Sequence, residues 1–389
     1  MTFSKIFKGV FESDKSAGIL LMLSTLIALT IANSALHPAY LEFWNTKILG
    51  LSVEHWVNDG LMAIFFFLIG LELEREVYSG KLSNFRDALL PMVAAFGGVA
   101  IPAIIHFTLN RGAQTQAGLG IPMATDIAFA LGVLAILGSR IPASLKLFLT
   151  TLAVIDDLIA IIVIAVFYTS NLSLLYLAGS LIVFGILICL NRIWRIMNLT
   201  LYLVGGVIMW FLMLKSGVHA TVAGLLLAFA IPYTSRSKDI PSPSQRLEHL
   251  LHKPVVFCIL PIFALANTGV IIGTDAMQDL MTDNSLGIIA GLVLGKPIGV
   301  TMFCLFAVLL GLTKLPSDLQ WKHIFGSGLL AGIGFTMSIF ITNLAFSDQA
   351  EMINSSKFAI LVASLCSGVL GYIWLMFAGR PVLHTDANS

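Results

Sequence analysis

The chain has 389 residues, of which 58% are hydrophobic and 11% are charged. A soluble domain carries about 25% charged residues, so this composition excludes a soluble protein and predicts an all-α, multi-pass membrane protein in a lipid bilayer. The net charge of +1 implies no nucleic-acid partner. The four cysteines lie singly in apolar runs, which predicts buried thiols rather than disulfides or a metal centre, and we expect no cofactor.

A membrane-spanning helix takes about 20 apolar residues. In chain order, twelve segments qualify: residues 16–34, 56–77, 87–109, 117–138, 143–168, 172–190, 199–214, 217–232, 251–272, 286–310, 322–346 and 355–378. They predict a single transmembrane domain over residues 1–389. The most polar connector, residues 233–253, follows the eighth segment and contains two prolines. We expect it to be a cytoplasmic hinge between two halves.

Positive charges predict the orientation of the chain. With the N-terminus in the cytoplasm, seventeen of the 22 Lys and Arg residues fall on the cytoplasmic side, four fall outside, and Lys296 remains within the membrane. Cytoplasmic loops of membrane proteins are enriched in Lys and Arg. The bias therefore supports an even number of spans with both termini in the cytoplasm.

The fourth and eleventh segments are interrupted by glycine, proline and polar residues. The interruptions are residues 120–126 in the fourth segment, and residues 326–328 and 331–336 in the eleventh. Small residues can simply let membrane helices pack closely, which is the plain alternative. Because the two segments occupy corresponding positions in two halves, segments 3–5 and 10–12 are predicted to form an inverted repeat whose interrupted helices cross beside a transport site. A faint sequence echo between residues 125–129 and 336–340 agrees with this prediction.

Five ionisable residues lie well inside apolar segments: Glu72, Asp126, Asp156, Asp157 and Lys296. A carboxylate at mid-membrane depth costs at least about 2.5 kcal/mol, so each of these residues implies a partner or a function. Asp126 lies where the fourth segment breaks, and Lys296 lies in the tenth segment. We predict that these two compensate the charges of the half-helix ends where the interrupted helices cross. A plain Asp126–Lys296 ion pair is the alternative.

Asp156 and Asp157 are neighbours in an otherwise apolar run. Adjacent helical residues point about 100° apart, so the pair can hold a cation from two directions, or one carboxylate can bind an ion while the other pairs with an ammonium. Burial favours the protonated form of a carboxylate, so protons and Na⁺ or Li⁺ would compete for the same oxygens. That competition by itself produces exchange. A catalytic aspartate pair is the alternative, but the sequence lacks the Gly-x-Gly-Asp setting of intramembrane aspartyl proteases, so we predict that the chain is not an enzyme.

Two charged clusters lie at the predicted cytoplasmic face, over residues 72–76 and residues 246–252. They are either a solvated boundary or a pH-responsive network in which His249 and His252 titrate near neutrality. The sequence does not fix whether the two clusters lie close together.

Six stretches carry a resemblance to a known family: residues 70–76, 124–132, 153–158, 215–221, 295–297 and 332–340. They are similar to the bacterial NhaA-type sodium/proton antiporters, and the resemblance runs nearly from end to end. It implies that Asp157 is the main cation-binding and proton-carrying carboxylate. It also implies that Asp156 shares the site and pairs with Lys296, and that Thr125 and Asp126 lie beside it. The implied pH-sensing residues are Glu72, Arg75, Glu76, Glu248, His249, His252 and His219.

The family's function implies electrogenic, pH-regulated export of cytoplasmic Na⁺ or Li⁺ in exchange for external H⁺ across the bacterial inner membrane. Several members are homodimers, so a homodimer is a further expectation, although residues 35–52 form a shorter loop than the family's dimer contact leads us to expect. The chain also departs from the family at Glu74, where a basic residue is common.

Two other transport functions fit the sequence less well. A sodium-coupled symporter of an organic solute would need further polar groups, which segments 1, 6, 7 and 12 hardly offer. A cation channel would need repeated acidic rings or filter loops, which the sequence does not show.

Overall fold

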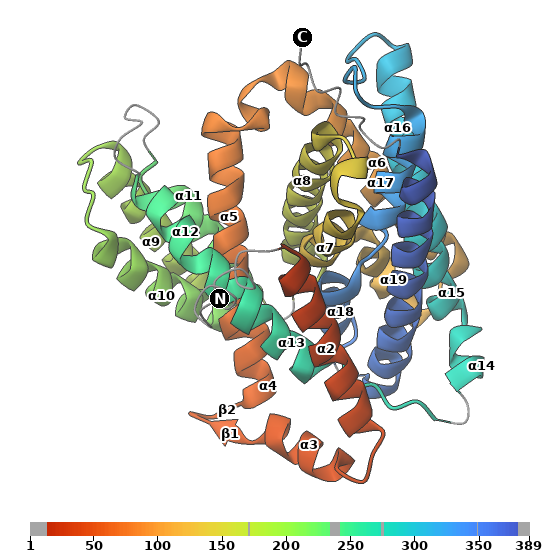
Figure 1. The fold of residues 1–389 in the computed structure, drawn as a ribbon. Helices are drawn as coiled ribbons and strands as arrows, with labels where there is room; N and C mark the ends of the chain where they lie inside the picture. Colours follow the sequence, from red (N-terminus) through yellow and green to blue (C-terminus); the bar gives the residue numbers. More distant parts are fainter. Residues whose placement is uncertain (1–13, 170–171, 234–241, 274–275, 348, 380–389) are drawn as a thin grey trace, which may run out of the picture.

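The computed structural model describes residues 14–169, 172–233, 242–273, 276–347 and 349–379 (Figure 1). The α-helices are α2 (Asp14–Ala32), α3 (His37–Asn45), α4 (Val53–His55), α5 (Met62–Ser79), α6 (Phe85–Leu109), α7 (Ile127–Leu137), α8 (Ala143–Phe167), α9 (Leu174–Arg192), α10 (Leu199–Ser216), α11 (Thr221–Ala230), α12 (Pro243–Pro254), α13 (Leu260–Asn267), α14 (Ala276–Leu280), α15 (Asp283–Ala290), α16 (Lys296–Leu309), α17 (Trp321–Ala331), α18 (Phe335–Ala345) and α19 (Ala350–Ala378). The π-helical turns are η1 (Trp56–Leu61), η5 (Val255–Ile259) and η6 (Gly291–Gly295), and the 3₁₀ segments are η2 (Lys81–Ser83), η3 (Gln114–Met123) and η4 (Gly138–Arg140).

The protein is an all-α, multi-pass membrane protein. Among the described residues, ten helices are long and apolar enough to cross a membrane, and the bent pair α17–α18 raises the number to eleven. The expected eighth span, residues 217–232, contains α11, which has only ten residues. A helix of that length reaches about 15 Å, half of a hydrocarbon core of about 30 Å. Seven of its residues are buried against other helices, so α11 is covered by protein rather than lipid.

Helix α5 stands between two groups of helices (Figure 1). On one side, α9–α12 enclose a small core that includes Tyr202 of α10 and Leu71 of α5. On the other side, α6–α8 and α15–α19 contribute to a larger core. There α6 crosses α16 at Gly97 and Gly299, which lie so close together that neither position has room for a Cβ atom. This close crossing holds the start of α16, where Lys296 lies, inside the larger group.

Both expected interruptions are present. In the fourth segment, η3 ends at Met123, residues 124–126 are extended, and α7 begins at Ile127. In the eleventh, α17 and α18 are bent by 47° around residues 332–334. Gly326 and Gly328 were expected to interrupt the helix, but they lie inside α17. There they allow close packing, since a Cβ atom on Gly328 would meet Pro297.

The predicted connector, residues 233–253, is shorter in the structure. Residues 234–241 lie outside the described part of the chain, and α12 begins at Pro243. Ser242 and Gln245 form a capping box and Pro243 occupies the first turn, so the local sequence starts a helix here. Helix α12 then continues through η5 into α13.

The short loop at residues 35–52 is also ordered. It contains α3 and a two-stranded antiparallel hairpin of β1 (Lys47–Ile48) and β2 (Leu51–Ser52). Leu49 and Gly50 turn the chain with positive φ angles of 53° and 87°. Leu49 is 89% exposed.

Candidate ion site at the crossing of two interrupted helices

The two helix interruptions cross and bind each other directly. The backbone N–H of Asp126 donates to the carbonyl of Ile333 at 2.7 Å. The Thr125 hydroxyl lies 2.8 Å from the carbonyl of Ala331. Extended backbone at membrane depth must find partners within the protein. Each interruption therefore supplies hydrogen-bonding groups that the other leaves unpaired.

Asp126 lies between two half-helix N-termini. Its carboxylate accepts from the backbone N–H of Phe129 at 3.0 Å and so caps α7. Its second oxygen accepts from the hydroxyl of Thr336 at 2.5 Å and from the backbone N–H of Thr336 at 3.2 Å, in the first turn of α18. Helix N-termini carry partial positive charge, which a carboxylate stabilises. Asp126 therefore contacts the first turn of both α7 and α18.

Lys296 pairs with Asp156 rather than with Asp126. Its Nζ lies 2.5 Å from Asp156 Oδ2 and donates to the hydroxyl of Thr125 at 2.9 Å. The Thr125 hydroxyl is also 2.8 Å from Asp156 Oδ2. Lys296 and Asp156 are fully buried, with no exposed side-chain surface. The plain Asp126–Lys296 ion pair considered as an alternative is not formed.

Three buried carboxylate oxygens remain unpaired at the crossing. Within the described residues, Asp156 Oδ1 and both oxygens of Asp157 have no hydrogen-bond partner. Both aspartates are fully buried, and Asp126 is 2% exposed. An ionised carboxylate without a partner is expensive to bury. These oxygens are therefore suited to bind a proton or a hard cation, either of which supplies the missing positive charge.

The chain matches a family model and several relatives over nearly its full length. The family model described as Na+/H+ antiporter 1 matches residues 8–375. The chain is 64% identical to a protein of Dechloromonas aromatica over 96% of each chain, and 55% identical to one of Flavobacterium psychrophilum over 100% of each chain. It is 53% identical to a protein of Cytophaga hutchinsonii, again over 100% of each chain. Each of the three is named Na(+)/H(+) antiporter NhaA.

The chain belongs to the Na⁺/H⁺ antiporter 1 family. The resemblance read from the six sequence stretches is thereby confirmed. Membership also confirms the prediction that the chain is a transporter rather than an enzyme. The structure adds how this antiporter family member arranges the residues that the sequence singled out.

The two charged clusters come together in this antiporter family member. Arg75 of α5 forms an ion pair with Glu248 of α12, and it lies 3.2 Å from Glu76. Glu72 lies one turn earlier on α5, close enough to interact electrostatically with Arg75, Glu76 and Glu248. His249 and His252 are exposed on α12, and His249 directly follows Glu248. Arg75 and Glu248 are thus neighbours, although they are 173 positions apart in the sequence.

One hydrogen bond joins α5 and α12 in addition to the Arg75–Glu248 ion pair, and a second joins α5 to Tyr233, which lies between α11 and α12. Ser244 of α12 donates to the buried carboxylate of Glu74 at 2.6 Å. The Ser79 hydroxyl lies 2.6 Å from the hydroxyl of Tyr233. The sequence marked Glu74 as a departure from the family but gave no sign of its partner. The partner of Glu74 is seen only in the structure, where α5 and α12 pack against each other.

His219 lies away from that network. It follows α10, and its Nε2 donates to the carbonyl of Tyr168 at 3.0 Å. The hydroxyl of Tyr168 in turn donates to the carbonyl of Ala117 in η3 at 2.8 Å. Burial lowers the pKa of His219, and the charge of Asp59 partly opposes this. Asp59 is sixteen residues before Arg75 along one continuous span, which corresponds to about 24 Å of helix.

Thr336 was not predicted as a site residue, although its side chain and backbone both bind Asp126. The sequence signals that included it were the interruption at residues 331–336, the family resemblance over residues 332–340 and the echo between residues 125–129 and 336–340. The carbonyl groups of Ala331 and Ile333 also belong to the crossing, because they accept hydrogen bonds from Thr125 and Asp126. Backbone groups carry no side-chain signature, so a sequence pattern cannot single them out.

Proposed function

We propose that the chain exports cytoplasmic Na⁺ or Li⁺ in exchange for external H⁺ across the bacterial inner membrane. The unpaired oxygens of Asp156 and Asp157 carry this proposal. A cation or a proton neutralises the buried charge, and each hinders the other at the same oxygens. Competition, followed by exposure of the site to the opposite side, gives exchange. The names of the relatives support Na⁺ and H⁺ as the transported ions.

Asp157 and Asp156 take different roles in this proposal. Neither oxygen of Asp157 has a hydrogen-bond partner among the described residues, so Asp157 is the main carrier of the cation and of the proton. Asp156 is held by Lys296 and Thr125 through Oδ2 and contributes Oδ1. No group of three His, Cys, Asp or Glu side chains in the described residues could hold a metal ion. Hard cations also bind carbonyl and hydroxyl oxygens as ligands. Such groups at the crossing would complete the coordination shell of the transported ion.

Electrogenic exchange requires more protons than sodium ions to move in each cycle. Each elementary charge moved is worth about 2.3 kcal/mol per 100 mV of membrane potential. Two buried aspartates offer more proton-binding capacity than one monovalent cation needs. The membrane potential can then drive the export of Na⁺.

The proposed moving element is an inverted repeat. It comprises segments 3–5, which correspond to α6, η3–α7 and α8, and segments 10–12, which correspond to α15–α16, α17–α18 and α19. Each unit places an interrupted helix between two longer helical segments. Counted with α11, the spans number twelve, with both termini in the cytoplasm and residues 233–253 as a cytoplasmic connector within the single domain, 1–389.

The proposed pH control rests on the contact between α5 and α12. The network consists of Glu72, Arg75, Glu76, Glu248, His249 and His252, with His219 acting separately through Tyr168. A change of charge among these groups alters the attraction between α5 and α12. Because α5 also borders the larger group of helices, such a change can reach the ion site.

We also propose a homodimer, with the exposed hairpin β1–β2 as its contact. Ile48 and Leu49 are 52% and 89% exposed on this two-stranded edge. An exposed strand edge with apolar side chains is a template for pairing with a second chain.

The test uses acid-loaded, inside-out membrane vesicles from cells without their own sodium/proton antiporters. Adding Na⁺ or Li⁺ should release protons with the wild-type chain and not with Asp157→Asn. Asp283→Asn, which changes an exposed aspartate at the start of α15, serves as the matched control and should retain proton release. Sodium-dependent uptake of an organic solute without proton release would instead favour the symporter. Proton release by Asp157→Asn at the wild-type level would overturn the proposal.

A further inference from the structure

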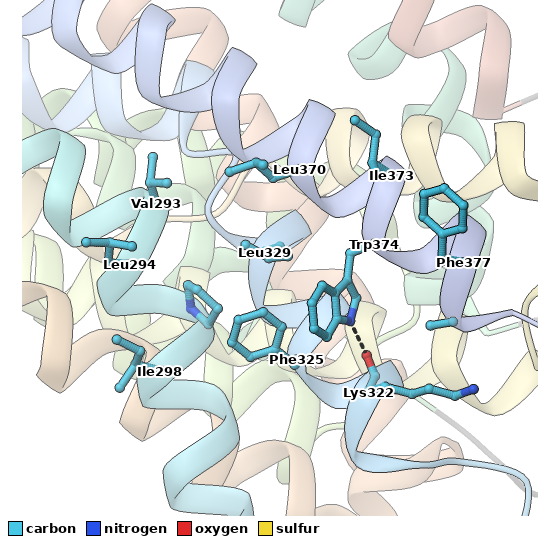
Figure 2. Close-up of a pocket in the computed structure, with 12 residues that line it drawn as sticks. Val293, Leu294, Ile298, Lys322, Phe325, Leu329, Leu370, Ile373, Trp374 and Phe377 are labelled. Carbon is cyan, nitrogen blue, oxygen red and sulfur yellow. Dashed lines mark hydrogen bonds between the residues drawn. The ribbon is translucent and has the colours of Figure 1, made fainter.

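An apolar groove of about 630 Å³ runs between α16, α17 and α19, on the outside of the larger group of helices (Figure 2). Its walls are side chains of all three helices and of the adjoining η6 turn. Leu294 is 56% exposed and Phe377 is 78% exposed, so the groove opens outward. In a membrane these side chains face lipid rather than water. The occupant of the groove is therefore apolar over most of its length.

One lining residue is charged. Lys322 lies in the first turn of α17, and its side chain runs along the lower end of the groove in this view (Figure 2). Its carbonyl accepts from the indole N–H of Trp374 at 2.8 Å, which fixes the start of α17 against α19. In the part of the chain that the structure describes, no carboxylate forms an ion pair with the Lys322 ammonium. This end of the groove therefore complements a negative charge.

Two tryptophans mark the depth of this end. Trp374 lines the groove, and Trp321 begins α17 and is 36% exposed. Tryptophan is enriched at the membrane–water interface, where phospholipid headgroups lie. Lys322 is thus at headgroup level, and the rest of the groove extends along the acyl chains.

We propose that this groove binds an anionic phospholipid, with one acyl chain between α16 and α19 and the headgroup phosphate on Lys322. The bound lipid packs against Pro297, which directly follows the site residue Lys296. On its other face Pro297 meets Gly328 of α17, where no room remains for a Cβ atom. The lipid therefore supports the contact of α16 with the interrupted helix from behind. This inference concerns binding and does not depend on the transported ion.

The experiment measures quenching of Trp374 fluorescence by brominated lipids. The full chain is reconstituted in phosphatidylcholine vesicles, and a rising fraction of lipid is replaced by brominated phosphatidylglycerol or brominated phosphatidylcholine. Subtracting the signal of Trp374→Phe isolates the indole in the groove. One lysine near anionic lipid is expected to give phosphatidylglycerol a preference of roughly fivefold over phosphatidylcholine.

Lys322→Gln should abolish that preference while both lipids still quench equally. Lys314→Gln, which removes an exposed lysine from the same α16–α17 connection, should retain it. Equal quenching by the two lipids in the wild type would show ordinary boundary lipid and overturn the proposal. Preference that survives Lys322→Gln would do the same, and so would a Trp374 that neither lipid quenches, because another protein chain then covers the groove.

A second measurement does not require the tryptophan variant. Native mass spectrometry of the full chain should find phosphatidylglycerol retained on the wild type and on Lys314→Gln after phosphatidylcholine has dissociated. Lys322→Gln should lose both lipids alike. If Lys322→Gln retains phosphatidylglycerol as the wild type does, the assigned headgroup site is wrong.

Discussion

At the scale of single residues, ion binding at the site depends on the carboxylate oxygens of Asp156 and Asp157, which have few hydrogen-bond partners. Asp156 Oδ2 is shared by Lys296 and Thr125, whereas the other three oxygens of the aspartate pair have no partner in the part of the chain that the structure describes. A fully paired carboxylate would have no reason to bind a transported ion, and a fully unpaired pair would be too costly to bury without one. Lys296 therefore compensates part of the buried negative charge, and the unpaired oxygens remain available to the exchanged ions.

Thr125 orients this pair, since one hydroxyl contacts Lys296, Asp156 and the carbonyl of Ala331. Thr125→Val keeps the shape but removes the hydroxyl. A hydrogen bond to a charged group contributes about 1.5–3 kcal/mol, so the Na⁺ concentration for half-maximal proton release should rise about tenfold or more. Thr301→Val is the control, because the Thr301 hydroxyl has no partner among the described residues. An unchanged Na⁺ requirement in Thr125→Val would contradict this role.

His219 should make stability depend on pH below neutrality. Burial lowers its pKa, so the folded protein favours neutral imidazole, whose Nε2 donates to the carbonyl of Tyr168. Unfolded histidine has a pKa of about 6.5, so stability is full above that pH. It falls as the pH drops towards the folded pKa, by at most about 1.4 kcal/mol per pH unit.

Thermal unfolding in detergent between pH 7.5 and pH 5 tests this dependence. His219→Gln should flatten the decline in melting temperature, while His37→Gln, at the start of α3 and outside the proposed network, should leave it unchanged. A decline of equal slope in His219→Gln and the wild type would assign the acid sensitivity to other groups.

At the scale of elements, the crossing depends on a carboxylate shared between two half-helices. Asp126 caps α7 through Phe129 and binds the first turn of α18 through Thr336. A continuous helix would need no such residue, since its backbone groups pair internally. Interrupting two helices at one point leaves two positive ends together, and one negative side chain stabilises both.

Asp126→Ala should therefore lower stability and ion affinity together. Losing a cap costs about 1 kcal/mol, and the further bonds to Thr336 raise the expected loss to roughly 2–4 kcal/mol. Thermal unfolding and the Na⁺ dependence of proton release measure the two effects. Asp126→Asn keeps one acceptor oxygen and should fall between Asp126→Ala and the wild type. Wild-type values of both quantities in Asp126→Ala would contradict the assignment.

At the scale of the whole molecule, a chain of amides connects three elements distant in sequence. Asn343 of α18 donates to Asn267 of α13 at 2.5 Å, and Asn267 donates to Asn58 of η1 at 2.8 Å. These bonds tie the second half of an interrupted helix to the span that contains α5. They complement the Arg75–Glu248 contact further along that span.

Removing the central amide should loosen this connection. Asn267 is 1% exposed, and Asn267→Ala leaves Asn58 and Asn343 without that partner. An unsatisfied buried polar group costs about 1–3 kcal/mol, so the melting temperature should fall by several degrees. Asn354→Ala, which removes exposed hydrogen bonds to Ile271, should have a much smaller effect. Equal losses in the two variants would show that the amide chain has no special weight.

Much of the fold could be predicted from the apolar segments of the sequence alone. A backbone in lipid must form its own hydrogen bonds, so length and composition alone predict spanning helices. Ten spans and the bent pair α17–α18 follow from this rule. Short segments obey it less strictly, because neighbouring protein can replace lipid. That is why α11 can end after ten residues, whereas α12 begins within the expected connector because Ser242 and Gln245 cap it there.

The sequence by itself determined that charged groups lie within the membrane and that two helices are interrupted. Both features stand out because charges and unpaired backbone groups are costly in the hydrocarbon region of a bilayer. The residues by themselves left the partner of Lys296 open, and only the family resemblance implied Asp156. The tertiary structure decided that Lys296 pairs with Asp156 and not with Asp126, and it alone showed that Ser244 meets Glu74. Partners separated by 140 and 170 positions leave no local pattern in the chain. The direction in which each helix faces its neighbour is set by packing over the whole molecule, and that direction selects which charges meet.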